Sequence, residues 1–274
     1  MRRLTAAASG LVITIGLAIV TAGGVAGASA GGTSAITARI DDQTVSFSPA
    51  LRAGFVQLHI VSTGSSPHHL LFWQLHRGVS FKQFDNVDAS QNGNPFKLAT
   101  VIGGNGPLAP GHTMDIWIHI AKGRVAIDDV RSGGASGFHR DLAISRAAQD
   151  ATQPKALGTL AAVPGDRFRL PPGFGRPGVW KFANQDGGTH DGTIAQLAPG
   201  KTVADLISWA KHGETGPPPL SGADGGFGAL GGHSQAWFTI GHLARGNYAI
   251  VCFIPGPNGA PHVAMGMAAG FTVR

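Results

Sequence analysis

The feature that most constrains the fold of this chain is a weak internal repeat. Two of the repeated segments carry four identical positions each, and three segments recur in the same order at offsets of 121 to 123 residues. Such self-similarity at one period indicates a duplicated domain, even though each match alone is slight. The matching segments are 59–84 with 181–206, 110–117 with 231–238, and 121–130 with 244–253.

The sequence also offers a boundary between the two copies. Residues 145–158, "SRAAQDATQPKALG", lack apolar periodicity and combine polar residues with a proline, a composition that is typical of a connecting segment. We therefore expect two domains, residues 31–150 and residues 151–274.

The first 30 residues have the order of a secretory signal. Arg2 and Arg3 precede an apolar run from Leu11 to Val20, and small residues end the segment at Ala28-Ser29-Ala30. The apolar run is too short for a spanning helix, and no later run is long enough to cross a bilayer. We expect residues 1–30 to be a signal peptide and the remaining chain to be secreted, outside the cytoplasm, without a membrane span.

Short apolar segments predict strands in both copies. The chain has 42 glycines and 17 prolines, which favours a turn-rich all-β protein. Four segments are rich in β-branched and aromatic residues and are bounded by turn residues. They are 55–61, 114–120, 236–240 and 247–254.

One short helix is expected to interrupt the second copy. Thr202 can cap it with Asp205 three residues on, and Gly213 can end it. Residues 213–228, "GETGPPPLSGADGGFG", have the composition of a long mobile loop. Strands, turns and one inserted helix predict a β-sandwich for each copy.

The charge balance does not indicate nucleic-acid binding. The chain has 21 Lys and Arg against 15 Asp and Glu, yet only 13% of its residues are charged. No basic run or basic helix stands out, so no nucleic-acid partner is expected.

The only cysteine is the strongest indication of chemistry. Outside the cytoplasm a single cysteine is either a free buried thiol or a metal ligand. Cys252 ends an apolar strand, and His262, Met265 and Met267 follow it. One thiolate, two imidazoles and a weak thioether suit copper that changes oxidation state. The second histidine must come from elsewhere, and His190, after a strand and a turn, is the best candidate.

At these residues the chain resembles the cupredoxin, or blue copper, family. The resemblance is strongest over 159–274 and rests on two groups of residues. They are Phe182, Asn184, Asp186 and His190 in the first group, and Gly246, Tyr248 and Cys252 with the loop to Met267 in the second. It implies two Greek-key β-sandwich domains in tandem, the first degenerate. It also implies one type 1 copper held by His190, Cys252, His262 and an axial Met267, and electron transfer with a redox partner protein.

The loop departs from the family's pattern. Nine residues separate Cys252 from His262, which is longer than the family usually has. Three prolines limit the freedom of this loop, so it could still close. The same length is compatible with a sandwich that has lost copper, in which Cys252 is a small buried hydrophobe. Met265 also competes with Met267 for the axial position.

The first copy lacks the thiolate and the thioether. At the repeat offsets His68 corresponds to His190, Asp129 to Cys252, His139 to His262 and Ile144 to Met267. Two histidines and a carboxylate could hold a harder ion, but exposed His and Asp are ordinary surface residues. We expect the first copy to be a structural or partner-binding domain.

Enzymatic alternatives find little support. A cysteine nucleophile with His262 as its base would lack a third group to orient the histidine. The family's oxidases use a histidine beside the cysteine or His-x-His pairs, whereas Cys252 is flanked by Val251 and Phe253 and no His-x-His occurs. We expect a non-enzymatic copper protein that transfers electrons, or one that stores or delivers copper. The alternative is a metal-free extracellular binding or structural module.

Overall fold

The computed structural model describes residues 35–90, 94–130, 136–147 and 150–274, so the predicted signal peptide, residues 1–30, lies outside the described residues. The described chain consists mainly of β-strands. The strands of the first half are β1 (Ile36–Ile40), β2 (Val45–Ser48), β3 (Gly54–Ser62), β4 (Leu70–Leu75), β5 (Ala99–Gly104), β6 (Thr113–Ile120), β7 (Gly123–Val130) and β8 (Ser136–Ile144). Those of the second half are β9 (Thr159–Val163), β10 (Arg167–Arg169), β11 (Gly178–Asn184), β12 (His190–Leu197), β13 (Leu220–Leu230), β14 (Gln235–Ile240), β15 (Gly246–Val251) and β16 (Ala268–Val273).

Four short helices complete the described chain. They are α1 (Phe81–Ser90), η1 (Pro95–Lys97), α2 (Val203–Lys211) and η2 (His262–Met265). Within the described ranges, no helix has both the length and the apolar character that a bilayer crossing needs. The four predicted strands correspond to β3, β6, β14 and β15, which confirms them.

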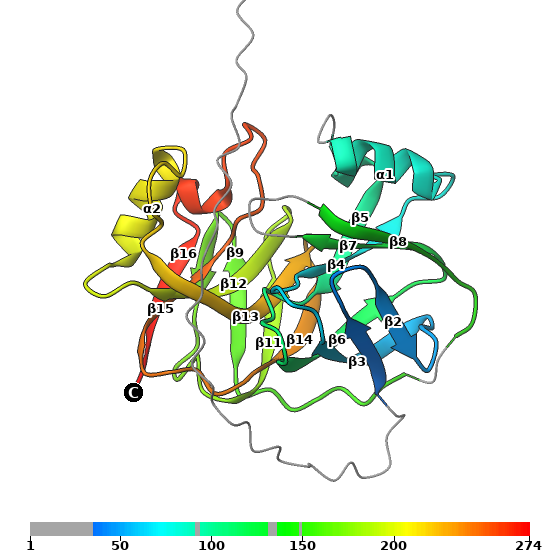
Figure 1. Cartoon of the computed structure of the whole chain (residues 1–274), viewed down its shortest axis with the longest axis horizontal. Helices are drawn as coiled ribbons and strands as arrows, with labels where there is room; N and C mark the ends of the chain where they lie inside the picture. The colour runs from blue at the N-terminus through cyan, green and yellow to red at the C-terminus, as the bar shows by residue number, and fades with distance from the viewer. Residues whose placement is uncertain (1–34, 91–93, 131–135, 148–149) are drawn as a thin grey trace, which may run out of the picture.

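The strands form two eight-stranded sheets, and each sheet takes four strands from each half of the chain. One sheet has the order β10-β9-β11-β14-β6-β3-β1-β2, and the other has the order β16-β15-β12-β13-β5-β4-β7-β8. The all-β sandwich predicted from the sequence is therefore confirmed. The two halves lie side by side and share both sheets (Figure 1). The predicted boundary at residue 150 falls between β8 and β9 and stays a prediction.

The two halves meet edge to edge in both sheets, and in one sheet the register is symmetric. In one sheet Trp237 pairs with Trp117 and Phe238 with Ile116, and in the other Leu230 pairs with Ile102. The repeat aligns Trp117 with Phe238, so each half contributes the same two positions to the first junction. This is the self-complementary pattern of an isologous interface, here formed within a single chain.

Strand pairing supports the repeat that the sequence suggested. Leu71 pairs with Asp128 in the first half. Shifted by 122 and 123 residues, the offsets of the two aligned segments, this pair becomes Thr193 with Val251, which is a pair of the second half. The three following pairs of β4 and β7 map onto β12 and β15 in the same way. The strand pairs β4–β7 and β12–β15 are therefore counterparts.

Both halves carry a helix at the same place, and only one was predicted. The α2 helix begins after Thr202, whose side chain and that of Asp205 form a capping box, as expected. The α1 helix begins after Ser80, where the Gln83 side chain accepts from the Ser80 amide at 2.9 Å. Ser80 and Gln83 are the repeat counterparts of Thr202 and Asp205. The helix expected in the second copy is confirmed as α2, whereas α1 in the first copy was not predicted, although Ser80 and Gln83 carry the same capping pattern.

The expectation of a mobile loop at 213–228 was wrong for the second part of this range, which belongs to β13. Glycines there permit close contact between backbones. A Cβ on Gly226 would lie 2.1 Å from the Gly192 carbonyl oxygen, and one on Gly228 would lie 2.7 Å from the Gly104 carbonyl carbon. Only glycine fits such approaches. These glycines allow β13 to lie between β12 and β5. From composition alone, the same glycines had suggested a mobile loop.

Candidate metal centre

Two paired strands bring His190 and Cys252 to one end of a sheet. His190 is the first residue of β12, and Cys252 directly follows β15. These strands pair antiparallel, so the start of one lies beside the end of the other. Their side chains can therefore meet although 62 residues separate them in the sequence.

The turn that precedes His190 is held by a buried amide. The Asn184 side chain donates to the carbonyl oxygens of Gly188 and Leu230, at 2.8 and 2.9 Å, and accepts from the Asp186 amide at 3.0 Å. These bonds tie the turn between β11 and β12 to β13. They fix the position from which His190 enters the site.

The long loop after Cys252 is pinched at its base. Pro255 and Pro261 form an isolated bridge, and the Gly256 amide donates to Ala260 at 2.8 Å. The His262 amide donates to the Ile254 carbonyl at 2.9 Å. Residues 256–260 therefore project as a tip. Beyond this tip the chain returns, and His262 lies again at the strand end beside Cys252. The unusual spacing between Cys252 and His262 is absorbed by this tip.

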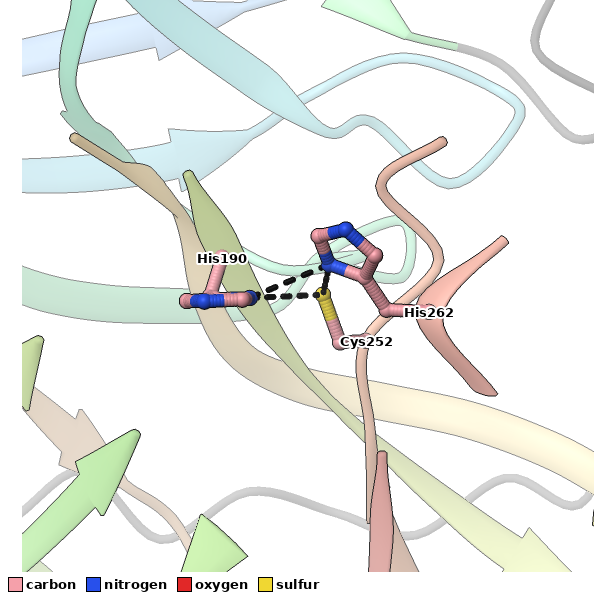
Figure 2. A group of neighbouring side chains, drawn as sticks. All are labelled: His190, Cys252 and His262. Carbon is pink, nitrogen blue, oxygen red and sulfur yellow. Dashed lines mark hydrogen bonds between the residues drawn. The ribbon is translucent and has the colours of Figure 1, made fainter. Parts of the chain in front are cut away.

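Three donor atoms converge at this strand end. The Nδ1 atoms of His190 and His262 lie 3.0 Å apart, and the Cys252 Sγ lies 3.8 Å from the first and 3.4 Å from the second. Figure 2 shows both imidazole rings turned toward the sulfur. All three residues are buried, with Cys252 at 0% and His262 at 7% exposure.

Burial sets the protonation of the three groups. It lowers the pKa of both imidazoles, and the neighbouring His262 lowers that of His190 further. Burial first, and then the carboxyl of Asp191, raise the pKa of the Cys252 thiol well above its usual value. Without a cation, the site therefore holds neutral imidazoles and a neutral thiol. A metal ion would stabilise the thiolate in place of the proton.

Asp191 is a site residue that sequence reasoning missed. It is buried, and its Oδ1 accepts from the Phe253 amide at 2.9 Å. Its pKa is raised to about 6, chiefly by burial. This bond ties the start of β12 to the residue after Cys252, so Asp191 helps to hold the cysteine in place. Its direct adjacency to His190 was the signal that could have found it.

The two candidate thioethers differ in burial. Met267 is fully buried and belongs to the same core cluster as Cys252. The Cys252 amide donates to the Met267 carbonyl at 3.1 Å, and the Met267 amide donates to the His262 carbonyl at 3.0 Å. Met265 is 41% exposed. The position of Met267 favours it over Met265 as the methionine beside the site.

The first copy does not assemble the corresponding group. His68 and Asp129 do meet, with Nδ1 to Oδ2 at 3.0 Å, and both are fully buried. His139, however, lies in β8 beside Asp88 and Asp128. His68, Asp129 and His139, which the repeat aligns with the second-copy residues, do not come together, because β8 pairs with β7 where the second copy has a loop. Ile144, the counterpart of Met267, is buried at the end of β8.

The residues of the second copy fit a single metal ion. Donor atoms bound at about 2.0 to 2.3 Å to one ion stand about 3 to 4 Å apart, which is the range of the three separations here. One sulfur and two imidazole nitrogens form a soft donor set that suits copper. His190, Cys252 and His262 would hold such an ion.

Comparisons with known proteins give distant similarities to solved structures only. No family model and no curated protein sequence matches the chain. Similar solved structures include auracyanin B, with 19% identity, a TM-score of 0.29, and 45% of this chain and 93% of that chain covered. Auracyanin from the photosynthetic bacterium Roseiflexus castenholzii has 21% identity and a TM-score of 0.27, with coverage of 43% and 95%.

A multicopper oxidase is similar over a longer range. It has 14% identity and a TM-score of 0.24, and the match covers 88% of each chain. The all-β arrangement of the described strands is the fold class that the cupredoxin resemblance implied.

Proposed function

We propose that His190, Cys252 and His262 hold one type 1 copper ion and that the protein transfers single electrons to or from a partner protein. The convergence of one sulfur and two Nδ1 atoms at a buried strand end supports this proposal most directly. Copper bound by a thiolate and two imidazoles supplies a change between Cu(I) and Cu(II).

The protein's part in this function is to fix the ligands and exclude water. His190 and Cys252 are held by paired strands, and His262 is held by its amide bond to Ile254. Burial keeps both imidazoles neutral, so their lone pairs are available to a metal. A site that is assembled beforehand needs little rearrangement when the charge of its ion changes.

The partner would approach over the 256–265 loop. His262 is the ligand residue carried by this loop, and the exposed Met265 lies beside it in η2. In this proposal Met267 would supply the weak thioether ligand, and His262 would be the route for the electron. Storage or delivery of copper would use the same residues. Export from the cytoplasm is part of the proposal and rests on residues 1–30.

An electron carrier agrees better with the site than an oxidase does. Cys252 has Val251 and Phe253 as its neighbours, and the sequence has no His-x-His pair. Oxidase chemistry needs further metal-binding histidines beside the cysteine site. We therefore propose a carrier that has no catalytic residues of its own.

The test is the visible absorption spectrum of the purified protein after addition of Cu(II), with Cys252→Ser as the control. We expect an intense blue thiolate-to-copper band in the native protein and none in the variant. A colourless native protein with a reduced Cys252 would contradict the proposal. The chain would then be a metal-free extracellular β-sandwich with a binding or structural role.

A further inference from the structure

A second group of metal-binding side chains lies in the first copy, apart from the proposed copper residues. His139 of β8 faces Asp88 of α1 and Asp128 of β7. Its Nε2 lies 3.1 Å from the Asp88 Oδ2 and 3.2 Å from the Asp128 Oδ1. Asp128 is only 3% exposed. The donors come from three elements that pack in series, because α1 contacts β8 and β8 pairs with β7 (Figure 1).

The three facing atoms have no hydrogen-bond partner. Although the separations are short, the Asp88 Oδ2, the Asp128 Oδ1 and the His139 Nε2 are each buried and unpartnered. Unsatisfied buried polar atoms are rare and costly, so three around one point need an explanation. A shared ion would satisfy all three at once.

The other nitrogen of His139 is already in use. Its Nδ1 bonds the Asp85 carboxylate. When Nδ1 carries the hydrogen, Nε2 presents its lone pair toward Asp88 and Asp128. A carboxylate behind the imidazole in this way orients metal-binding histidines and raises their basicity. Asp85 is therefore a positioning residue for His139.

The charge of the cluster also requires a cation. Asp85, Asp88 and Asp128 surround one imidazole, and within the described ranges no lysine or arginine forms an ion pair with any of them. A divalent cation between the three facing atoms would compensate this negative charge.

We propose that Asp88, Asp128 and His139 bind one divalent first-row transition metal ion, for which Zn²⁺ is the best match. One imidazole and two carboxylates are ligands that Zn²⁺ accepts. Donors bound at about 2.0 to 2.2 Å and spread by about 90 to 110° stand about 3 Å apart, as the two measured separations do. The ion would fasten α1 to β7 and β8.

The test is calorimetric titration of Zn²⁺ into chelator-treated protein that carries Cys252→Ser, which removes the sulfur site. We expect one Zn²⁺ per chain. Adding Asp128→Asn should weaken binding at least tenfold, and so should Asp88→Asn. Asp141→Asn is the matched control, because Asp141 lies on the same strand as His139 but pairs with Arg124; it should leave the affinity unchanged.

Two outcomes would overturn the proposal. One is the absence of Zn²⁺ binding to folded Cys252→Ser protein. The other is binding that Asp88→Asn and Asp128→Asn leave unchanged, which would place the ion elsewhere. Thermal melting checks that each variant is folded, and Asp88→Asn, on the helix, decides the matter if Asp128→Asn unfolds. Because this cluster contains no sulfur, it cannot produce the blue band that tests the copper proposal.

Discussion

The two copies bury different chemistry at the same pair of strand ends. In the first copy His68 meets Asp129, a closed pair of an imidazole and a carboxylate. In the second copy the counterparts are His190 and Cys252, and a third donor arrives from His262. The two copies share the backbone framework at these strand ends. They differ in the side chains at the ends and in the loop that follows Cys252, and these differences make the first group a structural pair and the second a candidate copper site.

Each copy also buries one carboxylate between its two strands, but from opposite sides. In the first copy Asp129 of β7 accepts from the His69 amide at 3.1 Å. In the second copy Asp191 of β12 accepts from the Phe253 amide at 2.9 Å. His69 and Asp191 are repeat counterparts. The bridging carboxylate can thus come from either of the two paired strands. In the second copy it comes from β12, so the position on the other strand that Asp129 holds in the first copy can be a cysteine.

The largest expected effect comes from giving the second copy the side chain of the first. Cys252→Asp should abolish the blue band completely, because a carboxylate cannot supply thiolate-to-copper charge transfer. Visible absorption after Cu(II) addition measures the change. If the variant remains blue, Cys252 is not the sulfur ligand and the contrast between the copies is mistaken.

A large effect on stability is expected at the closed pair. Asp129→Ala would leave a buried histidine and the His69 amide without their acceptor and should cost about 3 kcal/mol in the free energy of unfolding. Asp115→Ala is the control, because Asp115 pairs with His59 at a partly exposed position and should cost less than about 1 kcal/mol. Urea unfolding measures both. Equal losses of unfolding free energy in the two variants would show that the buried pair stabilises the protein no more than the partly exposed pair does.

A smaller, pH-dependent effect is expected at His69. Burial lowers its pKa from 6.5 to about 4, and its Nε2 is buried without a partner. The unfolded state therefore binds a proton below about pH 6.5 that the folded state binds only near pH 4. Stability is lost as the pH falls through this window.

The variant His69→Gln should remove this contribution, on the order of 2 kcal/mol between pH 7 and pH 5. Urea unfolding at several pH values compares the two proteins. An identical decline on acidification in both would show that His69 does not contribute to the acid sensitivity of the first copy.

The smallest effect is expected at the methionines. Met267→Leu keeps the volume of the core and should cost less than about 1.5 kcal/mol. It should leave the blue band in place and shift the reduction potential, because the axial ligand tunes it. Met265→Leu is the matched control and should leave the potential unchanged. The reverse pattern, measured by redox titration, would make Met265 the axial ligand.

The sequence predicted those parts of the fold that local patterns encode. Apolar β-branched segments gave four strands, and Thr202 with Asp205 gave the start of α2. The same capping chemistry at Ser80 and Gln83 was present and could have been found through the repeat. β13 was missed because its glycines serve close backbone contacts, which only the neighbouring strands reveal.

In the candidate sites, too, local sequence patterns could be predicted and tertiary contacts could not. The order of Cys252, His262 and Met267 could be read directly, and His190 was suggested by its place after a strand and a turn. The grouping of His139 with Asp88 and Asp128 could not be predicted, because it depends on β8 pairing with β7 and on α1 packing beside them. Asp191 could be suspected from its position, but its burial and its bond to Phe253 are tertiary facts.

The symmetric junction described above has a consequence for shortened chains. Within the whole protein, β6 is covered by β14, and β5 by β13. Cutting the chain between the halves would expose both edges on each fragment, and an unpaired edge is a template for another strand. Since β6 and β14 present the same pairing positions as each other, a truncated half can dimerise through that edge. A protein reduced to its second half would therefore be prone to self-association, and such a dimer would carry two copies of the His190, Cys252 and His262 group.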